Sequence, residues 1–112
     1  FSLNLYLMKR AAKILINIKD FSTFRASSCS AKSPIKTMEK VIVKKINNKI
    51  EIIFVSKSFL QQQVRSMVGC LKYLGEKKWT LKQFRDSALS KKRVNCAPPA
   101  PPHGLYLQEV KY

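Results

Sequence analysis

Residues 59–76, FLQQQVRSMVGCLKYLGE, carry the clearest hydrophobic pattern in the chain. Five apolar side chains recur at steps of four, three, four and three residues, the spacing of one helix face: Leu60, Val64, Met67, Leu71 and Leu74. Ser58 is suited to cap the start of this helix, and Gly75 is suited to end it. Arg65 falls about 120° from the centre of the apolar face, so it flanks the buried side of the helix.

Two shorter helices are predicted on either side of this long one. Residues 7–16 have apolar side chains at helical spacing: Met8, Ala11, Ala12 and Leu15. Residues 81–90 are predicted to form a helix capped by Thr80. Its inward side chains are expected to be Leu81, Phe84, Ala88 and Leu89.

The remaining pattern predicts three strands. Residues 40–46 and 50–56 are rich in β-branched residues, which favours strands. Asn47 and Asn48 between them suit a tight hairpin turn, because asparagine tolerates positive φ. Residues 105–112 alternate and are predicted to form a closing strand.

Three segments have the composition of turns and loops. DFSTFR, residues 20–25, is predicted to be a turn anchored by two phenylalanines, with Asp20 capping it through its carboxylate. Residues 26–38 are rich in Ser and Ala and are predicted to be a loop. Residues 94–104 form a proline-rich connecting segment, because prolines lack the N–H group that a helix or central strand needs.

The order of these elements predicts an α+β fold. A hairpin and a later strand give an antiparallel or mixed sheet, with the helices packed on one face. A chain of 112 residues is long enough for one compact core, so residues 1–112 are expected to be a single domain.

The charge is strongly unbalanced, with 22 Lys and Arg against 6 Asp and Glu and a net charge of +16. Such a surplus favours polyanionic partners, above all nucleic acids. The alternative is a generic basic surface, since lysine greatly outnumbers arginine. Candidate RNA contacts are the basic residues of the predicted loops: Arg25, Lys91, Lys92 and Arg93.

The residues that usually carry chemistry are sparse. Cys29, Cys70 and Cys96 have no CxxC spacing, and His103 is the only histidine, so neither a zinc site nor a disulfide framework is expected. Scattered cysteines fit a reducing, cytoplasmic compartment, and Cys70 is expected to be buried on its helix rather than nucleophilic. No phosphate loop, triad or acid–base pair can be assembled, so the residues by themselves indicate no catalytic centre.

The N-terminal 18 residues contain no apolar run near the roughly 20 residues that span a bilayer. A membrane-surface protein that uses this helix stays an alternative, although we expect no membrane partner, and it requires binding that depends on anionic lipid. Because the sequence begins with Phe rather than Met, a fragment of a longer protein is favoured.

Several segments, in consistent order over residues 8–112, resemble the C-terminal part of the tRNA pseudouridine synthase A family. They are DFSTFR, SPIKT at residues 33–37, the helix pattern F-L-x-x-x-V-R-x-x-V-G-x-L from Phe59 to Leu71, and an ending with Ala97-Pro98 and GLYL at residues 104–107. The resemblance implies half of a pseudouridine synthase fold. It also implies an isomerase that acts without cofactor or metal on uridines of the tRNA anticodon stem-loop, as a homodimer when full-length.

The resemblance further implies roles for two residues. Arg65 matches the helix arginine that pairs with the catalytic aspartate, and Leu105 matches a leucine that packs near the target base, which such enzymes flip from its stack. The catalytic aspartate belongs to a Gly-Arg-Thr-Asp-type motif in the N-terminal half of the family, and this sequence contains none. We therefore expect this chain to be inactive alone and to need that N-terminal half; the alternative is a non-catalytic basic RNA-binding module.

Overall fold

The computed structural model describes residues 3–25, 35–47, 49–59, 63–100 and 107–110. The described residues form helices, strands and two short 3₁₀ turns, which are labelled η. In chain order the elements are α1 (Leu5–Asn17), η1 (Ser22–Phe24), β1 (Met38–Ile46), β2 (Lys49–Ser56), α2 (Gln63–Gly75), α3 (Leu81–Ser90), η2 (Arg93–Asn95) and β3 (Leu107–Val110).

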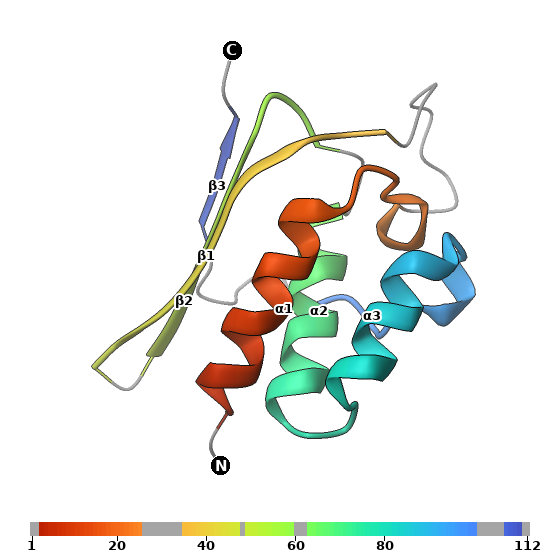
Figure 1. Cartoon of the computed structure of the whole chain (residues 1–112). Helices are drawn as coiled ribbons and strands as arrows, with labels where there is room; N and C mark the ends of the chain where they lie inside the picture. The colour runs from red at the N-terminus through yellow and green to blue at the C-terminus, as the bar shows by residue number, and fades with distance from the viewer. Residues whose placement is uncertain (1–2, 26–34, 48, 60–62, 101–106, 111–112) are drawn as a thin grey trace.

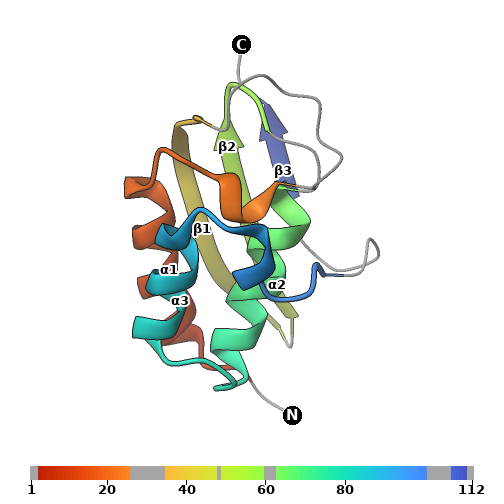
Figure 2. The same cartoon turned by 90° about the vertical axis from the view of Figure 1, so that its right-hand side faces the viewer.

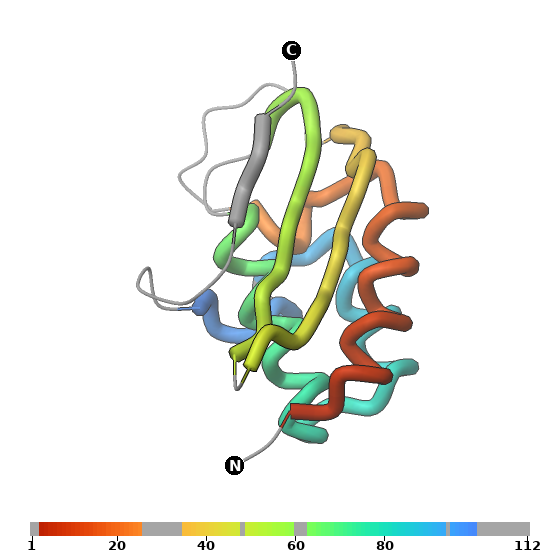
Figure 3. Tube along the Cα trace, turned by 90° about the vertical axis from the view of Figure 1, so that its left-hand side faces the viewer, coloured from red at the N-terminus to blue at the C-terminus, as the bar shows by residue number. Residues whose placement is uncertain are grey.

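The sheet and the helices form two layers (Figure 1). The strand order is β1-β2-β3, with β1 and β2 antiparallel and β2 and β3 parallel. Seen from the sheet side, the strands lie in front and all three helices lie behind them (Figure 3). The predicted α+β class, with a mixed sheet and helices on one face, is therefore confirmed.

The hairpin forms where the asparagines predicted it. Ile46 pairs with Lys49, and Asn47 adopts a positive φ of 56°, which asparagine tolerates better than most residues. Both strands begin slightly before their predicted starts, at Met38 and Lys49. An irregularity in β1 between Met38 and Lys40 shifts the register there. The two-residue alternation of side chains is broken at that point, so the sequence pattern did not reveal the first residues of β1.

The helix α1 buries the four side chains that its spacing predicted. Asn4 caps it by accepting a hydrogen bond from the amide of Leu7. In α3 the predicted cap is also confirmed, because Thr80 and Gln83 form a reciprocal capping box.

One inward side chain of α3 was predicted wrongly. Phe84 and Ala88 are buried, but Leu89 is 55% exposed. At 100° per residue Leu89 lies about 140° from Phe84, whereas Ser87 lies about 60° from it. Ser87 therefore takes the buried position, and its hydroxyl donates to the backbone carbonyl of Asn95.

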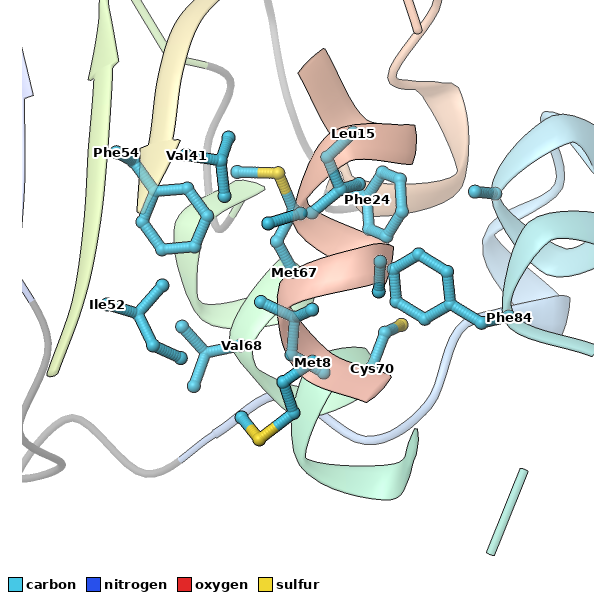
Figure 4. Packing of buried hydrophobic residues seen from close by; sticks show 14 of the residues in the cluster. Met8, Leu15, Phe24, Val41, Ile52, Phe54, Met67, Val68, Cys70 and Phe84 are labelled. Atoms are coloured by element: carbon cyan, nitrogen blue, oxygen red, sulfur yellow. The ribbon is translucent and has the colours of Figure 1, made fainter. Parts of the chain in front are cut away.

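The helix α2 lies at the centre of the core. Val64, Met67, Leu71 and Leu74 are buried as predicted, and they pack with side chains of α1, α3 and both hairpin strands (Figure 4). The predicted cap is wrong: Phe59, which would follow a Ser58 cap as the first helical residue, is not helical, and the Ser58 hydroxyl instead accepts a hydrogen bond from Lys36. Leu60 lies outside the described residues, so its burial stays a prediction. The helix ends at Gly75 as predicted, and a Cβ there would come within 2.8 Å of the sulfur of Met8, which belongs to a flexible side chain.

The predicted loops are only partly described. Met38, at the end of the predicted loop over residues 26–38, belongs to β1, whereas residues 26–34 lie outside the described residues. Residues 97–100 have no regular structure, as their prolines predicted. The closing strand is described only at β3, and Leu105 lies outside the described residues.

Candidate functional site

Arg65 lies in the first described turn of α2 and is half-buried, between the apolar face and solvent. Its Nε donates to the backbone carbonyl of Ala100 at 2.9 Å, and the Ala100 amide donates back to the Arg65 carbonyl at 3.0 Å. No carboxylate among the described residues forms an ion pair with Arg65. The guanidinium is therefore oriented by the backbone of a distant segment and still has N–H groups for an anion.

That distant segment, residues 96–100, lies along α2 (Figure 2), and we call it the strap. A Cβ on Gly69 would overlap the carbonyl of Pro98, so only glycine permits this approach. Ala97 and Ala100 are buried beneath the strap backbone. The strap therefore covers the side of α2 that bears Arg65, which explains why α2 is buried well beyond its apolar stripe.

The three basic residues after α3, Lys91 to Arg93, differ in their contacts and exposure. Lys91 ends the helix with a left-handed φ of 61°, and both Lys91 and Lys92 are exposed. Arg93 is half-buried, and its Nη1 donates to the hydroxyl of Ser66 on α2 at 2.6 Å. The two lysines therefore face solvent, whereas Arg93 is held against α2.

Asp20 has the capping role predicted for it. Its Oδ1 accepts hydrogen bonds from the hydroxyl of Ser22 at 2.6 Å and from the Ser22 amide at 2.9 Å. The hydroxyl bond is the main reason that the pKa of Asp20 lies below its ordinary 3.8; partial burial opposes the shift, and the positive charges of Lys91 and Arg25 reinforce it. The structure thus places two candidate RNA contacts, Arg25 and Lys91, near enough to this carboxylate for their charges to lower its pKa.

A second basic surface lies between α1 and α3, in an open groove of about 850 Å³. We call it the α1–α3 groove. None of its lining residues is acidic, and its basic residues make no ion pair within the described part of the chain: Arg10, Lys13, Lys82 and Arg85. Tyr6 at its edge is 66% exposed and accepts a hydrogen bond from Arg10 at 3.4 Å.

Sequence reasoning missed this groove, although a signal was present. Arg10 and Lys13, and likewise Lys82 and Arg85, are three residues apart on the polar faces of their helices, and such pairs are neighbours on a helix surface. The spacing within each helix did not predict that α1 and α3 pack beside each other (Figure 2). That adjacency converts two separate pairs into one cluster.

Two further classes of site find no support in the described residues. No group of His, Cys, Asp and Glu side chains there has a geometry that holds a metal ion. No helix in the described ranges is long and apolar enough to cross a membrane.

Comparison with known proteins points to one family. The family model for tRNA pseudouridine synthase matches residues 11–112. The tRNA pseudouridine synthase A of Pelagibacter ubique is 63% identical over 110 residues, which cover 98% of this chain and 45% of that protein. The proteins of the same name from Parvibaculum lavamentivorans and Afipia carboxidovorans are 45% and 41% identical, over 94% and 99% of this chain and 43% and 45% of theirs. The chain thus spans a little less than half the length of these curated relatives.

Proposed function

The chain belongs to the tRNA pseudouridine synthase family, and from this premise we propose that it is the C-terminal portion of an enzyme that isomerises uridine to pseudouridine in the tRNA anticodon stem-loop. The family match over residues 11–112 is the observation that carries the proposal. The chain covers 45% of its Pelagibacter ubique relative, so the activity proposed is that of a longer protein or of two associated chains.

Arg65 is the residue of this chain that we assign to the chemistry. Its Nε is occupied by the Ala100 carbonyl, which fixes the plane of the guanidinium while its terminal nitrogens keep their donors. A carboxylate from the N-terminal half would meet these donors in a charge-assisted pair, which positions an aspartate better than a single neutral hydrogen bond does. The role of Arg65 is to orient the aspartate that acts on the uridine.

The substrate side of the proposal follows from the same family. The target uridine leaves its stack to reach the aspartate, since an enzyme acting on a base cannot reach it inside a helix. Leu105 is proposed to pack near this base, and Arg25, Lys91, Lys92 and Arg93 to contact tRNA phosphates. Of these four, Lys91 and Lys92 are exposed and are assigned the main contacts, whereas Arg93 is already engaged with Ser66 and is assigned a minor one. We propose that the full-length enzyme is a cytoplasmic homodimer that uses neither metal nor cofactor.

The decisive experiment is reconstitution. The chain alone is expected to leave uridine unchanged in unmodified tRNA, because it lacks the aspartate motif. Co-expression with an N-terminal half that carries the Gly-Arg-Thr-Asp motif should restore pseudouridine formation, measured by chemical derivatisation and sequencing of the tRNA. Turnover by the chain alone, in a preparation free of host enzyme, would overturn the requirement for a second half.

The role of Arg65 is tested in the reconstituted enzyme. Arg65→Ala should lower turnover by about 100-fold or more, because a misplaced reacting group commonly costs this much. Arg65→Lys should rescue only part of the rate, since lysine lacks the planar fork of donors. Lys72→Ala, an exposed change on the same helix, is the matched control and should leave the rate unchanged. Equal rates for Arg65→Ala and Lys72→Ala would remove Arg65 from the chemistry.

The α1–α3 groove favours a second candidate function, a non-catalytic basic RNA-binding module. Its four basic residues lie together without acidic neighbours in the lining, which suits a phosphate backbone, and the exposed Tyr6 can stack on a base. RNA binding by the isolated chain, with no activity after reconstitution, would favour this candidate. Binding to anionic vesicles is the outcome expected for a membrane-surface protein, but the apolar face of α1 is already buried in the core.

A further inference from the structure

Cys70 and Cys96 are 26 positions apart in the sequence and meet beside α2. Their Sγ atoms are 3.6 Å apart, and both are free thiols. A disulfide bond is about 2.05 Å long, so the sulfur atoms need to approach each other by only about 1.5 Å. The sequence spacing concealed this pair, because neither cysteine belongs to a CxxC motif.

The two cysteines differ in access and in freedom to move. Cys70 is 1% exposed and lies in α2 within the packed core (Figure 4). Cys96 is half-buried and directly follows η2, at the start of the strap. One sulfur is therefore held in place, while the other can be reached from solvent and lies in a segment without regular structure.

The charges around the pair favour Cys96 as the reactive thiol. The pKa of Cys96 is lowered, first because it accepts a hydrogen bond from Cys70 and further by the charge of Arg93 and a hydrogen bond from Ser66, while burial opposes this. The pKa of Cys70 is raised by its hydrogen bond with Cys96 and by burial. Thiolates, not thiols, are the nucleophiles, so Cys96 reacts first and Cys70 is placed to resolve the product.

We propose that Cys96 and Cys70 form a thiol–disulfide modification site that is oxidised by hydroperoxides and that fastens the strap to α2. The Cys96 thiolate attacks one oxygen of the peroxide, the O–O bond breaks, and Cys96 becomes a sulfenic acid while water or an alcohol leaves. The Cys70 thiol then attacks the sulfenic sulfur: the S–S bond forms, the S–O bond breaks, and the hydroxyl group leaves as water with the proton of Cys70. Overall two thiols lose two electrons and two protons to one peroxide, and a dithiol reductant reverses the reaction by thiol–disulfide exchange.

The consequence of oxidation reaches Arg65 through the strap. From Cys96 the strap runs past Gly69, which contacts Pro98, to Ala100, which bonds Arg65 in both directions. A disulfide at the first of these contacts limits the departure of the other two from α2. The proposal concerns thiol chemistry and strap order, so it stands independently of the pseudouridine synthase function.

The first test is oxidation of the 112-residue chain with Cys29→Ser, so that only the pair can react. A small excess of hydrogen peroxide should lower the intact mass by about 2 Da, with a Cys70–Cys96 cross-link in the peptide map. The same treatment in urea should form the cross-link at least about tenfold more slowly, because the unfolded chain no longer holds the sulfurs together. A gain in mass through sulfinic acid at Cys96, with no cross-link under native conditions, would overturn the proposal, as would equal rates in urea.

The second test separates Cys96 reactivity from mere exposure. Arg93→Gln should slow alkylation of Cys96 by about threefold or more, since a neighbouring cation promotes the thiolate. Lys92→Gln removes one positive charge from the adjacent, exposed position and should leave the rate nearly unchanged. Equal slowing by both variants would mean that net charge, not the Arg93 contact, sets the reactivity.

The third readout is strap order. Oxidation should slow hydrogen exchange of the Ala100 amide, which donates to Arg65, by about tenfold, because closing the strap onto α2 restricts its opening. Addition of a dithiol should reverse the change, and Cys96→Ser should abolish it. Unchanged exchange at Ala100 in a fully cross-linked sample would show that the disulfide forms without fastening the strap.

Discussion

Two basic regions of this molecule are organised in opposite ways. Beside α2 the arginines are engaged with the chain itself, since Arg65 donates to a strap carbonyl and Arg93 to the hydroxyl of Ser66. In the α1–α3 groove, four basic residues line an open surface without an ion pair in the described part of the chain. The contacts beside α2 fix the geometry of the guanidinium groups, which suits the positioning of a reacting group. The basic residues of the α1–α3 groove keep positive charges that no acidic side chain neutralises, which suits the attraction of a polyanion.

The largest effect is expected where the strap contacts α2. Gly69→Ala should lower the free energy of unfolding by about 1–3 kcal/mol, because the new Cβ overlaps the Pro98 carbonyl and must displace backbone. Gly75→Ala is the matched control: its Cβ meets the movable sulfur of Met8, and alanine gains up to about 1 kcal/mol of helix propensity. Urea unfolding measures both, and a loss as large at Gly75 as at Gly69 would contradict the special role of the strap.

The groove should dominate electrostatic binding to RNA. Replacing Arg10, Lys13, Lys82 and Arg85 with glutamine should weaken tRNA binding at low salt by about tenfold or more. It should also reduce the magnitude of the slope of log K against log salt by up to about 3.6, at roughly 0.7–0.9 for each phosphate that the protein no longer neutralises. Titrations at several salt concentrations measure this slope.

The run after α3 provides the comparison for the groove. Lys91→Gln with Lys92→Gln should reduce the magnitude of the slope by up to about 1.8. Adding Arg93→Gln should change it little further, because Arg93 already donates to Ser66. If Arg93→Gln reduces the magnitude of the slope by a further unit or so, this arginine must leave Ser66 to bind RNA. An unchanged slope in the fourfold variant would remove the groove from the binding surface.

Stability should also distinguish the arginines of the two regions. Arg65→Ala should cost about 1 kcal/mol in the free energy of unfolding, because the Ala100 carbonyl loses a charged donor. Arg85→Ala, on the exposed face of α3, should change it by less than about 0.5 kcal/mol. Denaturant unfolding of both variants measures the difference, and equal values would mean that the Arg65 bond to the strap contributes nothing to stability.

The smallest effect concerns Asp20 and pH. The pKa of its carboxyl is lowered in the folded protein, so the charged form stabilises the fold above the ordinary pKa of 3.8, and this stability is lost as pH falls through the lowered value. The difference in unfolding free energy between the wild type and Asp20→Asn should therefore shrink as pH falls from about 5 to about 2. Ser22→Ala removes the main donor and should reduce the same pH-dependent part. A difference that stays constant with pH would contradict the assigned cause.

Much of the fold was predictable because its signals are local. The spacing of Met8, Ala11, Ala12 and Leu15 and the capping role of Thr80 were confirmed, as was the hairpin turn at Asn47. Leu89 was misplaced because an apolar residue was preferred to Ser87 at a buried position. What buries Ser87 is a distant partner, the carbonyl of Asn95, and helical spacing alone does not reveal such a partner.

The candidate site was only partly predictable. Arg65 was singled out through the family resemblance, while its residue type and spacing alone predicted an ordinary surface arginine. Its bond to Ala100 and the meeting of Cys70 with Cys96 both depend on the return of the strap to α2. The composition of a proline-rich stretch predicts that it forms neither a helix nor a central strand. The composition does not predict which surface of the protein the stretch will cover.

The sequence by itself determined some local choices of this protein: where α3 begins, where the hairpin turns, and the strong surplus of positive charge. These follow from backbone propensity, side-chain period and composition, which act over a few neighbouring residues or over the chain as a whole. Only the tertiary structure decided which arginines are engaged and which line an open groove, since these outcomes depend on packing between segments far apart in the chain. The same holds for Gly69: glycine is needed at this position only because the strap passes against α2 there and leaves no room for a Cβ.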